Sequence, residues 1–409
     1  MSAIRFRVAR LVAAATVPIF GVATAHADVI TDWNTKTGEL LVESKLGTPP
    51  AIRVLALVQS AAHDAVQATG REGSIDAAVA AAHRVALTKL LPAQQAAIDA
   101  AYQAALAAVA DGPAKAAGIA TGERAATTLL ARRAVDSVAS ADTYRPHTSA
   151  GAYVPTASPA AFSWTQRSGW GLASPSQFRV APPLALGSDG WARDYNEVHE
   201  FGAKNSTRRT TEQTEIARFW EYSLPPIYTG VVRSAAAQPG RDVAANARLY
   251  AAAAQALDDA MIAVFDAKYT YNFWRPATAI RNGDIDGNDS TQRDATWAPL
   301  IDAPMHPEYP SAHATLAAAI GAVLKAEFGP QVALATSSPT ARGATRRWAT
   351  VDDFVREVGE SRIYAGIHYR SSVDAGAAMG RRVGELTASR VLGTDPARLA
   401  AQPMRTAGN

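Results

Sequence analysis

The chain has 409 residues, no cysteine, and 40 Lys and Arg against 37 Asp and Glu, which gives a formal net charge of +3. Without cysteine it can form neither disulfides nor thiolate metal sites. Without a cationic surplus or a lysine-rich block it has no electrostatic footprint for nucleic acid. A chain of this length can bury one large core or two packed ones.

The first 27 residues have the pattern of a secretory signal peptide. Three arginines in residues 5–10 precede an apolar run at 11–22, and small residues at 25–27 form a cleavage site before Asp28. The run is shorter than the roughly 20 apolar residues that span a bilayer. We therefore expect an exported protein, periplasmic or secreted, whose mature chain has no membrane span. Loss of the three arginines lowers its formal charge from +3 to 0.

The next part, residues 28–140, is expected to be an N-terminal helical bundle. Its alanine-rich stretch places apolar residues three and four apart, as in Val54, Leu57 and Val58. This is the period of an amphipathic helix. Because Gly and Pro interrupt the stretch at several points, it predicts three or four helices.

Residues 141–208 are expected to form a loop-rich connection. Pro, Ser, Gly and aromatic residues replace the helical pattern there, and Trp164, Trp170 and Trp191 are among them. Loops longer than about 15 residues in a compact domain are often functional. Large aromatic side chains also suit a loop that docks onto neighbouring helices, and we expect this docking role for the tryptophans.

Residues 209–395 are expected to form a second helical bundle, followed by a tail at 396–409. Helical periodicity returns there in five segments: 211–220, 243–273, 311–328, 351–362 and 373–392. No segment shows the sustained alternation of a half-buried strand, and no long internal repeat occurs. The sequence thus predicts an all-α protein built from two packed helical bundles.

Three segments of the second bundle carry residues that suit an oxyanion. In the first, Lys268 and Arg275 are separated by two helical turns, so both cations lie on one face. Pro276 pushes Arg275 towards an extended backbone, which directs the guanidinium across the end of the bundle. Two cations on one helix more often lie on a solvated surface than in a binding site. This segment therefore indicates an anion site only together with the other two.

The second segment, Tyr309-Pro310-Ser311-Ala312-His313, begins a long helix. Ser311 is a typical N-cap residue, and the free N–H groups of a helix start favour an anion. His313 lies in the first turn and can exchange a proton near neutral pH. A histidine at a helix start is structural more often than catalytic.

The third segment contains Arg362, a tight glycine turn and His368. We expect Ser371 or Ser372 to cap the helix that follows, and Asp374 to complete a capping box. Together the three segments supply what a tetrahedral oxyanion bonded to histidine requires. Arginine forms bidentate contacts with its oxygens, and lysine adds a point charge. One imidazole can bond the central atom while the other transfers a proton.

In order along the chain, these segments resemble the signature of the superfamily of type 2 phosphatidic acid phosphatases and vanadium haloperoxidases. That signature is a lysine, six residues and Arg-Pro, then Pro-Ser-Gly-His, then Ser-Arg, five residues and His. The stretches YNFWRP at 271–276 and HPEYPS at 306–311 are more similar to vanadium chloroperoxidase than to the phosphatases.

The resemblance implies that vanadate is the cofactor and that His368 bonds its vanadium axially. Six residues are implied to hold the vanadate: Lys268, Arg275, Ser311, Ala312 through its N–H, Arg362 and His368. The implied cofactor is a Lewis acid whose vanadium stays oxidised, so neither haem nor flavin is needed.

The activity implied by the resemblance is oxidation of halide by hydrogen peroxide to hypohalous acid, which acts on a small organic acceptor. His313 is implied to take a proton from the peroxide, and Lys268 to polarise the bound peroxide. His306 stands where algal bromoperoxidases have histidine and the fungal chloroperoxidase has phenylalanine, so we expect bromide or iodide to be favoured over chloride. The alternative role for His306 is that of a hydrogen-bonded loop histidine.

Two positions depart from the family pattern. Ala312 stands where the family has glycine, and Ser372 stands where the phosphatases have the aspartate that orients their nucleophilic histidine. The second departure counts against a fast phosphatase. One alternative is an exported acid phosphatase, with His368 as nucleophile, His313 as leaving-group acid and phosphate supplied by the substrate. The other is a non-catalytic oxyanion-binding protein.

Overall fold

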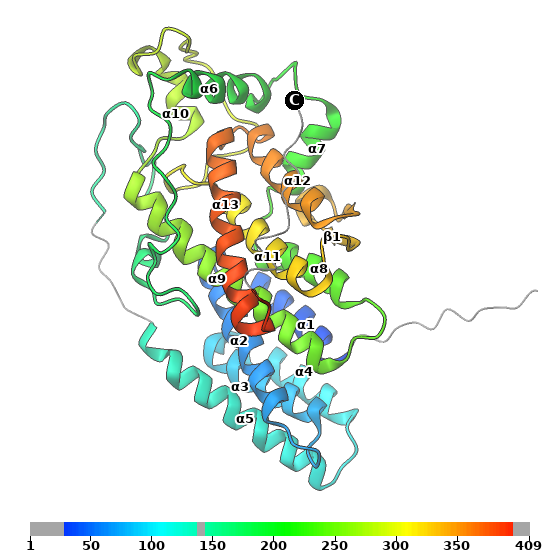
Figure 1. Ribbon diagram of the computed structural model, residues 1–409. Coiled ribbons are helices and arrows are strands. Elements are labelled where there is room, and N and C mark those ends of the chain that lie inside the picture. Colours follow the sequence, from blue (N-terminus) through cyan, green and yellow to red (C-terminus); the bar gives the residue numbers. More distant parts are fainter. Residues whose placement is uncertain (1–27, 137–143, 396–409) are drawn as a thin grey trace, which may run out of the picture.

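The computed structural model describes residues 28–136 and 144–395, so the expected signal peptide and tail lie outside the described residues. Figure 1 shows an elongated molecule in which the N-terminal helices form one end. The long helix α9 (Val243–Tyr271) connects this end to the rest. Among the described helices, none has the length and apolar character that a bilayer crossing requires.

The N-terminal end is built from closely packed helices. Within the described residues it contains α1 (Val29–Glu43), α2 (Thr48–Ala68), α3 (Ile75–Leu90), α4 (Gln95–Ala107) and α5 (Pro113–Arg133). Side chains cap two of these helices, because Asp28 accepts from the N–H of Thr31 and Ser74 accepts from that of Ala77. A Cβ at Gly122 of α5 would lie 2.1 Å from the carbonyl oxygen of Ala78, so α5 and α3 pack backbone against backbone.

The second part of the described chain contains eight α-helices. They are α6 (Asp189–Gly202), α7 (Thr211–Phe219), α8 (Pro225–Ala236), α9, α10 (Pro276–Arg281), α11 (Ala312–Phe328), α12 (Val351–Tyr364) and α13 (Arg370–Thr387). Five of them, α7, α9, α11, α12 and α13, lie where apolar periodicity predicts helices. The all-α fold class is confirmed.

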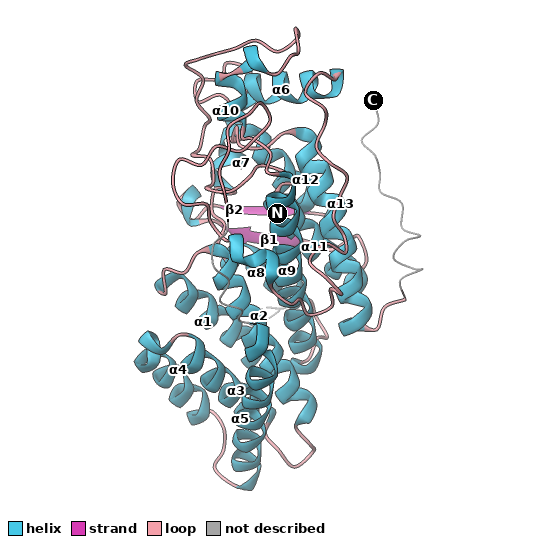
Figure 2. Cartoon of the chain, turned by 90° about the vertical axis from the view of Figure 1, so that its left-hand side faces the viewer, coloured by secondary structure: helices cyan, strands magenta, loops and turns pink. Residues whose placement is uncertain are grey.

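Several elements differ from the prediction. Helix α6 lies inside the segment expected to be a loop, and Trp191, Ala192, Tyr195 and Val198 form its buried apolar face. A short antiparallel pair, β1 (Leu334–Ser337) and β2 (Thr345–Trp348), was not predicted; it appears as magenta arrows in Figure 2. Each strand has four residues, too few to show a sustained alternation.

One large cluster of buried residues, from Ile30 to Val383, joins the N-terminal helices to the second bundle. A separate cluster that includes Trp191, Tyr195 and Ile280 packs α6 and α10. Helix α9 lies at the centre of the large cluster, in contact with α2 on one side and α11 on the other. Its residues are buried on all faces from Leu249 to Lys268, as expected for a helix enclosed by others. The same helix therefore carries Lys268 from the shared core into the second bundle.

Helices α11 and α13 meet through a row of glycines on α13. A Cβ at Gly380 would lie 2.0 Å from the carbonyl oxygen of Thr315, and a Cβ at Gly376 or Gly384 would also lie within 2.6 Å of a carbonyl oxygen of α11 or its N-cap.

Gly380→Ala should therefore lower the free energy of unfolding by about 1–3 kcal/mol, the usual cost of overpacking. Urea unfolding followed by circular dichroism measures the change. Gly187→Ala, where an added Cβ meets open space, is the control; equal stability of the two variants would contradict the prediction.

Candidate active site

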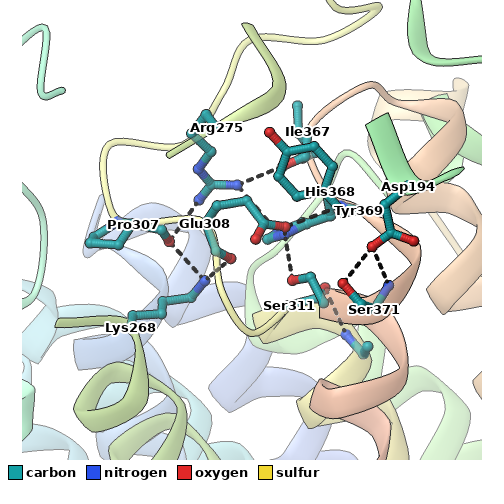
Figure 3. Close-up of polar contacts among 12 residues, drawn as sticks. Asp194, Lys268, Arg275, Pro307, Glu308, Ser311, Ile367, His368, Tyr369 and Ser371 are labelled. Carbon is teal, nitrogen blue, oxygen red and sulfur yellow. Dashed lines mark hydrogen bonds and ion pairs between the residues drawn. The ribbon is translucent and has the colours of Figure 1, made fainter. Parts of the chain in front are cut away.

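Helix α9 ends in a turn that directs two cations to the same place. Asn272 adopts a left-handed conformation (φ 46°) and its N–H closes the helix on the carbonyl of Lys268. Arg275 then has the extended backbone expected before Pro276, with φ −78° and ψ 154°. Both side chains are buried and turn towards the loop before α11 (Figure 3).

Backbone carbonyls of that loop bind Lys268. Its ammonium donates to the carbonyl oxygen of Pro307 at 2.9 Å and to that of Glu308 at 2.7 Å. These contacts leave one of the three ammonium hydrogens for another acceptor. Burial, followed by repulsion from Arg275, holds the pKa of Lys268 well below its usual range.

Arg275 connects the three motif segments. Its Nε donates to the carbonyl of His306 at 3.0 Å, and Nη1 donates to the carbonyl of Ile367 at 2.9 Å. Nη1 also lies 3.3 Å from Nε2 of His368, and Nη2 lies 3.0 Å from Nδ1 of His306. Because a guanidinium can only donate, Nε2 of His368 acts as an acceptor. Nδ1 of His306 also lies 3.2 Å from the carbonyl oxygen of Pro307, which can only accept. Burial lowers the pKa of Arg275 to about 10.

His368 is held by a buried carboxylate. Its Nδ1 lies 2.7 Å from Oε1 of Glu308, and the same oxygen accepts from the N–H of Tyr369 at 3.1 Å. Since Nε2 accepts from Arg275, the ring proton belongs on Nδ1, where it is donated to Glu308. Burial, then the charge of Arg275, holds the pKa of His368 well below its usual value. Burial raises the pKa of Glu308 to about 7.

Glu308 was not predicted from the sequence to belong to the site. The carboxylate that orients a histidine in the phosphatases was sought at position 372, but Ser372 lies 3.4 Å from Nδ1 of His368 as a secondary contact. Glu308 instead reaches the histidine from the loop before α11. The sequence places Glu308 between Pro307 and Tyr309, just before a helix start, but only the structure shows that it is buried, and a fully buried glutamate is almost always paired.

The expected capping box at the start of α13 is wrong. The N-cap residue is Tyr369, which makes no side-chain cap. The N–H and hydroxyl of Ser371 both bind the carboxylate of Asp194 on α6, as Figure 3 shows. Ser371 thus attaches α13 to α6, which lies in the segment expected to be loop.

The start of α11 supplies hydrogen-bond donors. Ser311 caps the helix as expected, because its Oγ accepts from the N–H of Ala314. Ala312 is the first residue of α11, so its N–H is one of those that a helix leaves without an internal partner. It is not among the residues with positive φ, and alanine therefore fits this position without backbone strain.

Two further side chains bring unused polar atoms. Arg362 is buried, and its Nη1 donates to the carbonyl of Trp220. Its Nε, like Nε2 of His313, is buried without a hydrogen-bond partner in the described part of the chain. Burial, then the charge of Arg362, holds the pKa of His313 well below its usual value. Burial lowers the pKa of Arg362 to about 10.

A cavity of about 250 Å³ gives access to His313 and His368. His306, His313 and His368 line it together with Ala312, and apolar side chains such as Leu316 form other parts of its wall. Phe265 packs edge-on against the ring of His306 at 5.2 Å. His306, His313 and His368 therefore border the same cavity, and part of its wall is apolar.

The buried charges near His368 do not balance. Lys268, Arg275 and Arg362 are cations buried almost completely, and Glu308 is the carboxylate buried among them. After burial, repulsion from Arg275 contributes to the lowered pKa values of Lys268 and Arg362. Backbone carbonyls solvate the cations but do not neutralise them, and buried unpaired charge is costly. The arrangement suits a multiply charged oxyanion.

Comparisons with known proteins address the fold that carries this site. A family model described as the VCPO second helical-bundle domain matches residues 248–394. The structure of the first bacterial vanadium-dependent iodoperoxidase is similar to this chain, with a TM-score of 0.76, 22% identity, and coverage of 88% of this chain and 95% of that one. An apo bacterial vanadium-dependent chloroperoxidase gives a TM-score of 0.68, 17% identity, and coverage of 85% and 94%. Among curated proteins there is no significant match. The expected resemblance to the vanadium haloperoxidase superfamily is confirmed.

The contacts of His368 predict its tautomer. At about pH 6 its ring should be neutral, with the proton on Nδ1, because burial disfavours the imidazolium and Arg275 donates to Nε2. Long-range ¹H–¹⁵N NMR distinguishes the two nitrogens, and the signals lost in His368→Ala identify the residue. A protonated Nε2, or an imidazolium at that pH, would show that the ring is held differently.

Proposed function

We propose that this chain, which has the fold of the vanadium haloperoxidases, is a vanadate-dependent haloperoxidase that oxidises halide with hydrogen peroxide to hypohalous acid. One observation carries the proposal. Three buried cations, with the carboxylate of Glu308 among them, surround His368, which lines a cavity and whose Nε2 is unprotonated. A tetrahedral oxyanion with vacant coordination for nitrogen would balance the charge and could take the Nε2 lone pair in place of its 3.3 Å contact with Arg275.

The donor set fits vanadate. Lys268 retains one ammonium hydrogen, Arg362 has an unused Nε, and the N–H of Ala312 opens the α11 helix. Ser311 can donate its hydroxyl hydrogen while it caps the helix. Nε2 of His368 is the nitrogen that would bond vanadium. Bound vanadate supplies Lewis acidity without a change of oxidation state.

His313 suits the role of proton acceptor from hydrogen peroxide. Its pKa is held well below the usual value, so the ring is neutral at neutral pH, and its Nε2 has no competing partner among the described residues. An oxyanion beside Lys268 would stabilise the charge of this lysine, since opposite charge raises the pKa of an ammonium. Lys268 could then polarise the bound peroxide with its remaining hydrogen.

We propose bromide or iodide as the halide and a small organic molecule as the acceptor. His306 lies at the cavity wall, with its ring fixed between Nη2 of Arg275 and the face of Phe265. A large polarisable halide suits this partly apolar wall. Efficient oxidation of chloride would remove the halide part of the proposal.

One observation favours a second candidate, a histidine-nucleophile phosphatase. Glu308 orients His368 through Nδ1, which supplies the carboxylate whose absence at position 372 counted against this activity. In that case the oxyanion is the phosphate of the substrate, and His313 would protonate the leaving group. The two activities share the cradle, so the assay must separate them.

We also propose that the chain is exported to the periplasm or beyond the cell, on the strength of the basic and apolar pattern in residues 1–27. N-terminal sequencing of the protein recovered outside the cytoplasm should begin at Asp28. An intact residue 1 in the cytoplasmic fraction would contradict export.

Purified protein should oxidise bromide or iodide when orthovanadate and hydrogen peroxide are both present. His368→Ala should abolish the activity, and His313→Ala should lower kcat about 100-fold or more through loss of the proton acceptor. His63→Ala, away from the cavity, is the control. Phosphate release from a phosphoester without vanadate, inhibited by vanadate and unaccompanied by halide oxidation, would establish the phosphatase instead. Absence of both activities would favour a non-catalytic oxyanion-binding protein.

Glu308→Ala should weaken vanadate binding by about 10- to 100-fold, because the carboxylate fixes the tautomer and orientation of His368. Glu308→Gln should lose less, since its amide oxygen can still accept from Nδ1. Equilibrium titration with orthovanadate measures the affinity, and Glu72→Gln, at an exposed position, is the control. Equal losses in the alanine and glutamine variants would indicate that charge, rather than orientation, is what Glu308 contributes.

A further inference from the structure

A second group of cations lines a cavity outside the site described above. The cavity has a volume of about 320 Å³ and lies among α2, α3, α5 and the connection that follows α5. Its lining includes four cations, Arg53, Lys89, Arg133 and Arg167, and one acid, Asp136.

The two inner cations have carboxylate partners. Arg53 donates to Oδ2 of Asp258 at 2.5 Å and also pairs with Asp136. Arg133 places Nε 2.5 Å from Oδ2 of Asp136, and its Nη1 donates to the carbonyl of Gly169 at 3.1 Å. These contacts build a fixed basic wall but leave little positive charge unmatched.

Arg167 and Lys89 differ from them. Within residues 28–136 and 144–395, neither side chain has an ion pair or a hydrogen bond, and Nε of Arg167 is buried. The guanidinium of Arg167 stacks on the ring of Trp164 at 4.1 Å, which fixes its plane. Burial, then the charge of Arg53, lowers the pKa of Arg167. A half-buried guanidinium without an acceptor forgoes strong charge-assisted hydrogen bonds.

The remaining wall of the cavity is apolar. Leu57, Leu90 and Leu130 contribute to it from three different helices. A ligand that satisfied the cations alone would leave this surface in contact with water. An anionic head group joined to an apolar body matches both parts of the wall.

We propose that this cavity binds an organic anion, whose carboxylate or phosphate head group is held by Arg167 and Lys89 and whose apolar body packs on Leu57, Leu90 and Leu130. The two head groups share the chemistry of a charged oxygen acceptor for a guanidinium fork. This site is separate from the oxyanion cradle at His368, and the proposal does not depend on the haloperoxidase activity.

Isothermal titration calorimetry of the purified protein with hexanoate tests the proposal, with hexyl phosphate, acetate and inorganic phosphate as comparisons. Hexanoate or hexyl phosphate should bind saturably and about tenfold or more tighter than the matching ligand without the alkyl chain, since several methylenes leave water. The stronger of the two identifies the preferred head group.

Arg167→Gln and Lys89→Gln should each weaken that binding about tenfold, the loss expected for one charge-assisted contact. Arg132→Gln is the matched control, because Arg132 neighbours Arg133 but is exposed and does not line the cavity. Lys89 is also exposed, so its variant remains informative if Arg167→Gln folds poorly.

Three results would overturn the proposal. The first is absence of saturable binding by either alkyl ligand. The second is binding that Lys268→Gln removes and Arg167→Gln leaves unchanged, which would place the ligand in the oxyanion cradle. The third is equal affinity for the ligands with and without the alkyl chain, which would leave the leucines without a role.

Discussion

The burial of three cations in a helical core is the constraint on which the rest of the site depends. The side chains of Lys268, Arg275 and Arg362 are shielded from water, and backbone carbonyls take the place of solvent around them. Carbonyl dipoles satisfy the hydrogen-bond donors but leave the positive charge intact. A site in which carbonyl dipoles solvate the cations keeps its positive charge and attracts an anion. A site in which carboxylates paired with the same cations would have no net charge to attract one. The loop before α11 therefore has a backbone role as well as a side-chain role.

Glu308 shows how the two roles combine. Its carbonyl oxygen accepts from Lys268 while its carboxylate accepts from His368. One residue thus fixes the position of a cation and the tautomer of the imidazole. A carboxylate that hydrogen-bonds a ligating histidine tunes the basicity of the histidine as well as its orientation. In this chain the partner lies five residues before His313, so both histidines depend on the path of the same loop.

The sequence predicted what is encoded locally. Helical periodicity located α7, α9, α11, α12 and α13, and the motifs contain Ala312, His313 and His368, which line one cavity. It missed α6, where Trp191, Tyr195 and Val198 have helical spacing but follow a stretch rich in Pro, Ser and Gly, and it missed α8, α10 and the short pair β1–β2. It also missed Glu308, because a contact across 60 residues leaves no periodic mark in a single sequence. Ser371 was expected to cap its own helix, but Asp194, far away in the chain, binds it instead.

The hydrogen bonds of Arg275 join its own segment to the loop at 306–307 and to the turn at 367–368, across 31 to 93 residues of sequence. None of these contacts can form in a chain that is only partly made or partly threaded through a membrane. If the protein is an exported haloperoxidase, as we propose, its oxidising activity would be absent until the polypeptide has folded at its destination. The topology of the site would then protect the cell that synthesises it.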